Sequence, residues 1–294
     1  MQKQRVLVIA LMVVAFAAGA TAQEASYDVP FVPTPEEVVN TMLNLANVGK
    51  DDVLYDLGCG DGRIVINAVK KFGARGIGID IDPRRIEESK ANAAKAEVSD
   101  RIQFKQENLF KTDFSDATVL TLYLLSSVNL RLRPTILSKL KPGTRVVSHD
   151  FSMGEWEPDQ SVELETNGTH HNVYFWIVPA NASGIWEWTM PDIPNGGKCS
   201  LKVEQHFHKG EGTLTIGDEK IPVKDIAIKG DLVQFTASYR NNNGEKIPVK
   251  YSGNVLGNSF ECVAKPESGR PTNFRAERDQ STVKTLDSGK SNSR

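Results

Sequence analysis

The residues best suited to bind a ligand lie in a glycine-rich loop that follows a short apolar strand. Between positions 53 and 63 an acid precedes three alternating glycines, with a cysteine among them: Asp56, Gly58, Cys59, Gly60 and Gly62. Glycine tolerates positive φ and has no Cβ, so a ligand can lie directly against this backbone. An apolar, helix-compatible run begins at Ile64. The N-terminus of such a helix offers unpaired N–H groups and a positive dipole end.

The spacing of the glycines separates the classes of ligand. Gly-x-Gly-x-Gly differs from Gly-x-Gly-x-x-Gly, the spacing that binds the pyrophosphate of a dinucleotide. A nicotinamide-dependent enzyme is therefore not indicated. A glycine-rich turn without a ligand is the structural alternative, although a plain turn seldom needs three glycines. We predict a backbone cradle for a nucleotide-like ligand.

Further polar side chains occur where later strands are expected to end. Asp80 closes the apolar stretch 76–80, 24 residues after Asp56, and a carboxylate can accept hydrogen bonds from two hydroxyl groups. Alone, Asp80 would be interpreted as a cap for the helix that Pro83 opens. The next three strand ends carry Asn108, Tyr123 and Asp150. Ligands of open α/β sheets bind beyond the carboxyl ends of the strands, so these residues form one candidate site.

Strands and helices alternate through the first half of the chain. The expected strands are 53–56, 76–80, 102–105, 118–125 and 144–149. This alternation predicts an α/β fold with a Rossmann-like, doubly wound parallel sheet. Two further strands, 162–165 and 172–178, flank an Asn-Gly pair and predict an antiparallel hairpin. The stretch 152–160 is too short and too rich in turn residues for a full fifth crossover helix.

Asp-x-Gly-x-Gly-x-Gly, followed by an acid at the end of the second strand, resembles motif I and its neighbour in the class I S-adenosylmethionine (SAM) methyltransferases. The resemblance implies that Asp56 and the glycine-rich loop hold the amino-acid end of SAM, and that Asp80 binds the two ribose hydroxyls. It also implies that Asn108 accepts from the adenine amino group, at a position where many relatives carry an acid. The Leu109 N–H would serve an adenine ring nitrogen, and Ile81 would pack on the adenine face.

Three longer segments are similar to one branch of that family: 30–35, 56–64 and 73–78. The branch contains mitochondrial protein-lysine methyltransferases that act on the adenine nucleotide translocase and the ATP synthase c-subunit, together with bacterial relatives. The resemblance covers roughly 28–158 and implies that the segment 32–35, with Thr34, closes over the methionyl end of SAM. From the residues alone, Thr34 is expected to cap the helix that Pro35 opens.

Candidates for the methyl-transfer step lie at the ends of the fourth and fifth strands. The methyl group of SAM is already activated, so the site must place a nucleophile in line and deprotonate or desolvate it. We assign this role to Tyr123, His149 and Asp150. An acidic or carbonyl-lined pocket would orient a lysine amine, whereas a histidine base would suit an oxygen or carbon nucleophile. As an alternative, His149 points into a packed face.

The other histidines do not suggest a metal centre. His170 and His171 near the hairpin turn, and His206 and His208 on a later strand, are expected to be exposed. No set of His, Cys, Asp and Glu residues has the spacing of a zinc site. We therefore predict no metal.

Charge and the N-terminal residues bear on partners and location. The 294-residue chain has a net charge of −2 and a pI of about 6.2, so it lacks the positive field that collects nucleic acid. Residues 1–22 combine a basic start, an apolar run and Ala-x-Ala, which indicates a secretory signal peptide. A retained anchor is the alternative, but the run is short for a bilayer. We expect an exported protein, periplasmic or secreted, with no membrane span after cleavage.

The character of the sequence changes after the α/β region. We expect the methyltransferase domain over 23–180 and an all-β domain, a sandwich or barrel of about seven strands, over 185–265. The polar residues 266–294 are expected to be a disordered tail. Cys199 and Cys262 either form a disulfide between the first and last strands of the β domain or remain unpaired in its core.

Two functions are consistent with these features. The first is a SAM-dependent methyltransferase whose acceptor the sequence does not identify, with a protein lysine side chain as the first choice. The alternative is an exported, catalytically inactive protein that binds SAM, a nucleoside or a partner protein. The alternative arises because SAM is made in the cytoplasm, and export would separate the enzyme from its cofactor. Nothing in the sequence indicates an oligomeric state.

Overall fold

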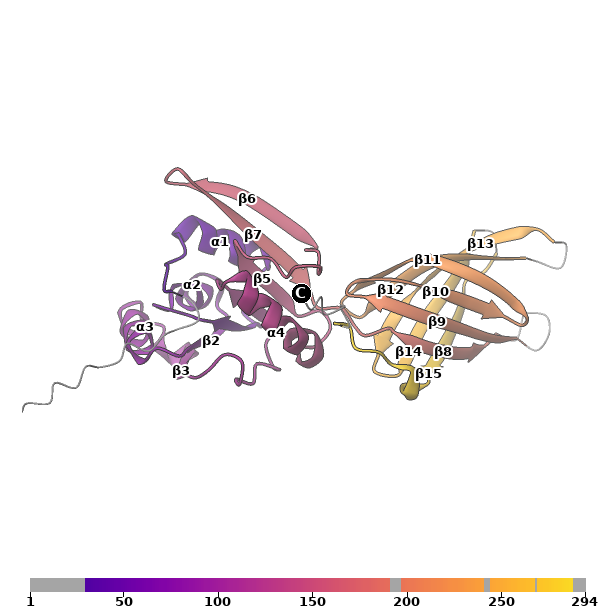
Figure 1. Ribbon diagram of the computed structural model, residues 1–294, viewed down its shortest axis with the longest axis horizontal. Coiled ribbons are helices and arrows are strands. Elements are labelled where there is room, and N and C mark those ends of the chain that lie inside the picture. The colour runs from indigo at the N-terminus through magenta and orange to yellow at the C-terminus, as the bar shows by residue number, and fades with distance from the viewer. Residues whose placement is uncertain (1–29, 191–196, 241–243, 268, 288–294) are drawn as a thin grey trace, which may run out of the picture.

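The structure consists of an α/β domain followed by a β-barrel domain, placed side by side along the long axis of the molecule (Figure 1). It is a computed structural model and describes residues 30–190, 197–240, 244–267 and 269–287. The α/β domain spans 30–178 and the barrel domain 184–278. The signal peptide expected at 1–22 lies outside the described residues.

The sheet of the α/β domain has the strand order β3-β2-β1-β4-β5-β7-β6 within the described chain. Its strands are β1 Val53–Leu57, β2 Arg75–Asp80, β3 Ile102–Gln106, β4 Val119–Leu122, β5 Arg145–His149, β6 Gln160–Thr166 and β7 Thr169–Ile177. The first five pair in parallel, whereas β7 is antiparallel to both β5 and β6. The predicted doubly wound sheet with an antiparallel hairpin is confirmed. The order reverses between β1 and β4, which is where ligands bind in such sheets.

Helices cover both faces of this sheet. They are α1 Glu36–Leu45, α2 Arg63–Phe72, α3 Pro83–Lys95 and α4 Ser126–Lys139, with a short 3-10 turn, η1, at Ser99–Arg101. β1 is buried along its whole length. Its Leu54 packs with α1 and α2 on one face, while Val53, Tyr55 and Leu57 pack with α4 on the other. This burial on both faces explains the continuous apolar run that predicted the strand.

The barrel domain is a closed antiparallel barrel of eight strands in the order β10-β11-β12-β13-β14-β15-β8-β9. Its strands are β8 Gly184–Thr189, β9 Lys198–His206, β10 Lys209–Ile216, β11 Glu219–Lys229, β12 Leu232–Arg240, β13 Lys246–Leu256, β14 Ser259–Pro266 and β15 Thr272–Arg278. Buried and exposed residues alternate along these strands, as in β14, because every second side chain points inward. Closure of the barrel leaves no long free strand edge.

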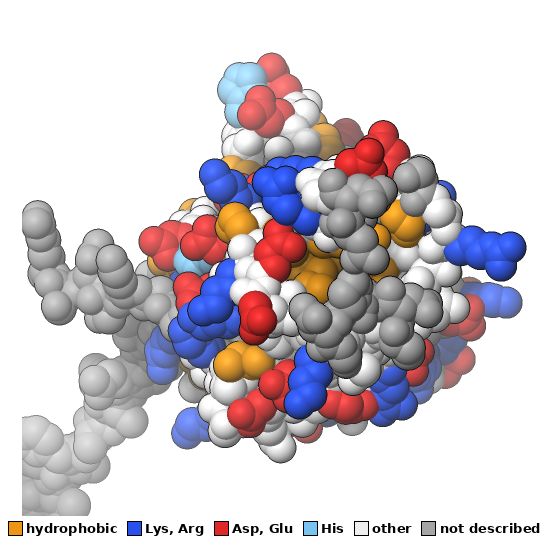
Figure 2. All heavy atoms as spheres, turned by 90° about the vertical axis from the view of Figure 1, so that its right-hand side faces the viewer, with side chains coloured by type: hydrophobic (Ala, Val, Ile, Leu, Met, Phe, Trp, Pro, Cys, Tyr) orange, Lys and Arg blue, Asp and Glu red, His pale blue; other side chains and the backbone are white. Residues whose placement is uncertain are grey.

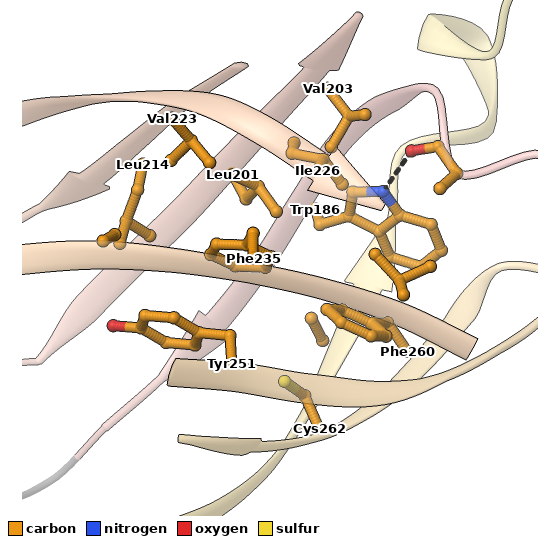
Figure 3. Close-up of a cluster of buried hydrophobic side chains, with 14 of the residues drawn as sticks. Trp186, Leu201, Val203, Leu214, Val223, Ile226, Phe235, Tyr251, Phe260 and Cys262 are labelled. Atoms are coloured by element: carbon orange, nitrogen blue, oxygen red, sulfur yellow. Dashed lines mark hydrogen bonds between the residues drawn. The ribbon is translucent and has the colours of Figure 1, made fainter. Parts of the chain in front are cut away.

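Large apolar side chains fill the inside of the barrel (Figure 3). The rings of Phe235 and Tyr251 stack with their centroids 4.6 Å apart. The indole of Trp186 packs edge-on against Phe260, and its Nε1 donates a hydrogen bond to Ala182 O at 2.9 Å. The inner residues therefore form a packed core, and the N–H of Trp186 is satisfied by the segment that enters the barrel.

The predicted disordered tail is wrong for residues 272–278, which form β15. This strand pairs with β14 along its length and with β8 through Glu277 and Arg278, so it closes the barrel. Of its residues only Ala276 is fully buried, and Phe274 is partly buried against the core. A strand with so few apolar residues has the composition of a polar tail, which explains the error.

The two cysteines of the barrel domain are free and buried. Cys199 lies on β9 and Cys262 on β14, so neither is on the first or last strand, contrary to expectation. Burial raises the pKa of the Cys199 thiol to about 11 and that of Cys262 to about 12. Both act as small apolar core residues.

The two domains meet at a packed junction. Phe207, in the turn between β9 and β10, is 1% exposed and belongs to the same apolar cluster as Trp156 and Trp176 of the α/β domain. Arg133 of α4 lies over the Phe207 ring at 4.9 Å and forms an ion pair with Asp287 at 2.7 Å. Apolar packing and a largely buried ion pair thus join the domains.

The end of the barrel remote from the α/β domain has a mixed surface. Figure 2 shows Lys and Arg side chains interspersed with Asp and Glu on this face, without a large region of one sign. None of the described helices is long and apolar enough to cross a membrane.

Candidate active site

A pocket opens beyond the carboxyl ends of β1, β2, β3 and β4. The empty space in it, its open mouth included, is about 1140 Å³. Most of the predicted site residues line it: Thr34, Asp56, Gly58, Cys59, Gly60, Asp80, Ile81, Asn108, Leu109 and Tyr123. Gly62, His149 and Asp150 do not. The strand-end residues Asp56, Asp80, Asn108 and Tyr123 thus share one pocket, because parallel strands end at the same edge of the sheet. Asp150, expected in the same site, lies outside the lining.

The glycine-rich loop leaves β1 and crosses over the end of β2. The N–H groups of Gly58 and Cys59 both donate to Ile79 O, at 2.8 and 2.9 Å. Gly60 has a φ of +55°, and a Cβ there would lie 2.4 Å from the ring of Phe31. Only glycine fits at this position, since both the backbone conformation and the available space exclude a side chain.

Gly62 has a different role from the other two glycines of the loop. It is the left-handed N-cap of α2, with a φ of +79°. A Cβ on it would lie 2.8 Å from Phe104 and 2.9 Å from Ser89, both on the protein side. Gly62 therefore permits close packing of the helix rather than lining the pocket.

Asp56 is a buried acid at the base of the loop. It is 2% exposed, and Thr121 Oγ1 donates to its Oδ1 at 2.8 Å. Burial raises the pKa of Asp56 to about 7, and the charges of Asp80 and Asp61 act in the same direction. A cation in the pocket would favour the ionised form. This property fits the ammonium group at the amino-acid end of SAM.

Asp80 connects the second strand to the loop. Its Oδ2 accepts a hydrogen bond from Gly60 N and its Oδ1 accepts one from Asp82 N, both at 2.9 Å. Burial raises the pKa of Asp80. The helix cap that the alternative interpretation gave to Asp80 is instead Asp82, which accepts from Arg84 N at 2.9 Å. Asp80 therefore faces the pocket.

The third strand end supplies the residues expected at the adenine. Asn108 lines the pocket, and its Oδ1 accepts a hydrogen bond from Phe110 N at 2.9 Å. Leu109 is half-buried beside it, and Ile81, opposite, is 48% exposed. An apolar side chain exposed at a pocket wall offers a surface for a flat ring. The role of each residue toward adenine stays a prediction.

The segment 30–35, which we call the strap, covers one side of the pocket. Phe31 lies beside Gly60, and the guanidinium of Arg85 sits 4.3 Å from its ring centroid. Arg63 Nη1 donates to Thr34 O at 2.9 Å while the same guanidinium pairs with Asp61. The strap is therefore held to the first turn of α2.

The predicted capping role of Thr34 is wrong. Pro35 is the N-cap residue of α1, and no side chain caps that helix. Thr34 is 3% exposed, and its Oγ1 lies 3.2 Å from His149 Nδ1. The hydroxyl thus turns toward the end of β5 instead of toward its own helix.

His149, Asp150 and Tyr123 form a cluster behind the pocket wall. The rings of Tyr123 and His149 stack with centroids 3.8 Å apart, and Tyr123 separates His149 from the pocket. His149 is fully buried and its Nε2 lies 3.1 Å from Asp150 Oδ2. Burial lowers the pKa of His149 to about 4, so its imidazole is neutral at neutral pH. Of the three predicted catalytic residues, only Tyr123 reaches the pocket.

His171 completes this cluster and was missed from the sequence. The sequence predicted an exposed side chain, but His171 is buried, with an exposed fraction of only 7%. Its Nδ1 lies 2.9 Å from His149 Nε2. Its neighbour His170 has an 87% exposed side chain, as expected. The register of β7 against β5 places His171 at the site. The alternation along the hairpin was the available signal, since neighbouring residues of a strand face opposite sides.

Comparison with known proteins agrees with this fold. The model of the ANTKMT methyltransferase domain matches residues 56–160. A protein-lysine N-methyltransferase of Saccharolobus islandicus (strain REY15A) is 46% identical over 151 residues, which cover 51% of this chain and 94% of that protein. The adenine nucleotide translocase lysine N-methyltransferase of Mus musculus is 30% identical over 157 residues, 53% of this chain and 65% of the mouse protein.

A solved structure also resembles this chain. It is an RNA methyltransferase from Salinibacter ruber in complex with S-adenosyl-L-homocysteine, 55% identical, with a TM-score of 0.49. The likeness covers 50% of this chain and 94% of that one.

The sheet order, the glycine-rich loop and the strand-end acids are those of a class I SAM-dependent methyltransferase. The chain belongs to the branch of these enzymes defined by the ANTKMT methyltransferase domain. The predicted family is confirmed, and SAM is its cofactor. The pocket fits SAM, because a buried acid, a second acid at the next strand end and a glycine that excludes any Cβ line it together.

Proposed function

We propose that this protein transfers a methyl group from SAM to the ε-amine of a lysine in a protein substrate. The observation that carries the proposal is the 46% identity to the Saccharolobus protein-lysine N-methyltransferase, of which this chain spans 94%. The mouse relative at 30% identity bears a lysine methyltransferase name as well. The inactive binding protein considered as an alternative is not favoured by these relatives.

The rim of the pocket suits the stem of a lysine. Two large apolar side chains of the strap are exposed at the pocket: Phe31 at 45% and Val32 at 53%. Apolar surroundings lower the pKa of an approaching amine, because they disfavour its charged form. A neutral amine is the nucleophile that this reaction needs.

Tyr123 is the residue that orients the amine in this proposal. Bound SAM supplies an activated methyl group, so the protein needs only to position the acceptor and remove water. Burial raises the pKa of Tyr123, so the phenol stays protonated and its oxygen can accept a hydrogen bond from the amine. His149 stacks behind Tyr123 and holds its ring in place.

The acceptor class is tested by transfer of a tritiated methyl group from SAM to a protein extract and, separately, to total RNA. We expect label on protein, and mass spectrometry should place the added methyl group on lysine. Label on RNA alone, or on protein side chains other than lysine, would overturn the proposal.

Two glycine variants give a matched control for cofactor binding. Gly60→Val should abolish SAM binding in calorimetry, because its side chain would meet the strap and close the pocket beside the loop. Gly49→Ala lies in the same domain, with open space around its Cβ position and no positive φ. It should bind SAM like the native protein. Equal affinity of the two variants would refute the assignment of the loop.

We also propose that residues 1–22 direct export. The support is the basic, apolar and Ala-x-Ala pattern of the segment. A fusion of the first 25 residues to a reporter that is active only after export tests it. Reporter activity confined to the cytoplasm would contradict it.

A further inference from the structure

The cluster behind Tyr123 contains three side chains whose donor atoms converge on one point. His149 Nε2, His171 Nδ1 and Asp150 Oδ2 are separated by 2.9, 3.1 and 3.6 Å. Donor atoms that share one ion at about 2.1 Å lie ~3.0–3.4 Å apart, depending on the coordination geometry. The three distances lie within about 0.2 Å of this range, so small side-chain shifts would let the three atoms share a single ion.

Neutral imidazoles satisfy this arrangement at best with one hydrogen bond shared between two acceptors. If the proton of His149 is on Nδ1, its Nε2 lone pair faces the carboxylate of Asp150 at 3.1 Å. If the proton is on Nε2 instead, it is shared between two acceptors, or it faces a second N–H of His171 at 2.9 Å. The first assignment opposes a lone pair to a carboxylate, and the second divides one proton between two acceptors or opposes two N–H groups. A cation at this point gives each of the three atoms a partner of its own, because all three can then present lone pairs.

We propose that His149, Asp150 and His171 form a site for a divalent transition-metal ion, with Zn²⁺ the preferred occupant. Two imidazoles and one carboxylate are a donor set of zinc sites that keep an open coordination position, and other first-row metals share this preference. The side chain of Asp150 is 26% exposed, which gives the ion a route from solvent.

The surroundings of the three side chains support this role. Thr34 Oγ1 lies 3.2 Å from the other ring nitrogen of His149, where it can fix the tautomer that directs Nε2 to the ion. Asn172 N donates to Asp150 Oδ1 at 2.7 Å, which leaves Oδ2 for the metal. His149 and Asp150 therefore have the outer contacts that orient metal ligands in proteins.

The site has a consequence for the neighbouring pocket. Its ligands come from the end of β5 and from β7, and Thr34 links it to the strap. A bound ion would fix the spacing of these three segments and the ring against which Tyr123 stacks. The proposal does not depend on the methyl acceptor.

Cobalt spectroscopy tests the proposal on the full chain, purified without a histidine tag and stripped with a chelator. Co²⁺ should bind with a stoichiometry of one, produce visible d–d absorption and be displaced by Zn²⁺. His171→Ala should lose this absorption, while His170→Ala, the exposed neighbour on the same strand, should retain it. SAM titration of each variant shows whether the pocket is intact.

Two results would overturn the proposal. One is the lack of saturable cobalt absorption in the native chain, and the other is equal absorption in the His170 and His171 variants. If His171→Ala does not fold, Asp150→Asn decides, with the rise of the melting temperature on Zn²⁺ addition as the second readout. That rise should be present in the native chain and lost in the variant. Its retention would refute the site.

Discussion

At the residue scale, the burial of Asp56 makes the stability of the protein dependent on pH. The pKa of Asp56 is about 7 in the folded chain, against about 3.9 for an exposed aspartate. The folded state therefore holds this proton more tightly than the unfolded state. Between about pH 4 and pH 7, Asp56 should reduce the free energy of unfolding as the pH rises.

Asp56→Asn should remove that part of the pH dependence. Across this pH range, the free energy of unfolding of the native chain should fall by a few kcal/mol more than that of the variant. One unit of pKa shift corresponds to about 1.4 kcal/mol. Denaturant unfolding at a series of pH values measures it, with the exposed Asp51→Asn as control. Parallel curves for the native chain and the Asp56 variant would show that Asp56 is ionised in the fold.

At the scale of elements, the strap depends on a contact far away in the sequence. Arg63 donates to the backbone of Thr34 and is itself fixed by Asp61, so it joins the strap to α2. Arg63→Ala should weaken SAM binding about tenfold, which corresponds to the loss of one charge-assisted hydrogen bond. Hydrogen exchange of the strap amides should become faster in the same variant.

A lysine variant separates charge from geometry at this position. Arg63→Lys keeps the charge but cannot form both contacts with one planar group. The strap amides should therefore exchange hydrogen as fast in Arg63→Lys as in Arg63→Ala. Native exchange rates in both variants would mean that the strap is held by Phe31 instead.

The order of elements in the α/β domain was predictable, because buried parallel strands and amphipathic helices have distinct apolar patterns. The pocket residues at strand ends followed from topology. Other features depend on pairing between distant segments, which a single sequence does not reveal. His171 is buried by the register of β7, and Thr34 turns toward His149 instead of capping α1. β15, which contains Ala276, has a polar sequence, and it forms a strand because it pairs with its neighbours in the barrel.

At the scale of the whole molecule, the junction makes the barrel part of the α/β core. The Phe207 ring stacks near Trp156, with centroids 6.2 Å apart, and this cluster lies on the α4 side of the sheet. Ala180 N also donates to Gly230 O of the barrel at 2.7 Å. Contacts of this kind couple the two domains energetically, since neither can move without exposing apolar surface.

Phe207→Ala should lower the free energy of unfolding by about 3–5 kcal/mol, as expected for removal of a buried aromatic ring. The amides of 178–184, between the domains, should then exchange faster. Leu256→Ala, at the end of β13 where the side chain is 60% exposed, is the control and should change stability by less than about 0.5 kcal/mol.

Phe207 has a φ of +52°, so Phe207→Gly should be more stable than the alanine variant although both lack the ring. If Phe207→Ala behaves like Leu256→Ala, the ring does not couple the two domains.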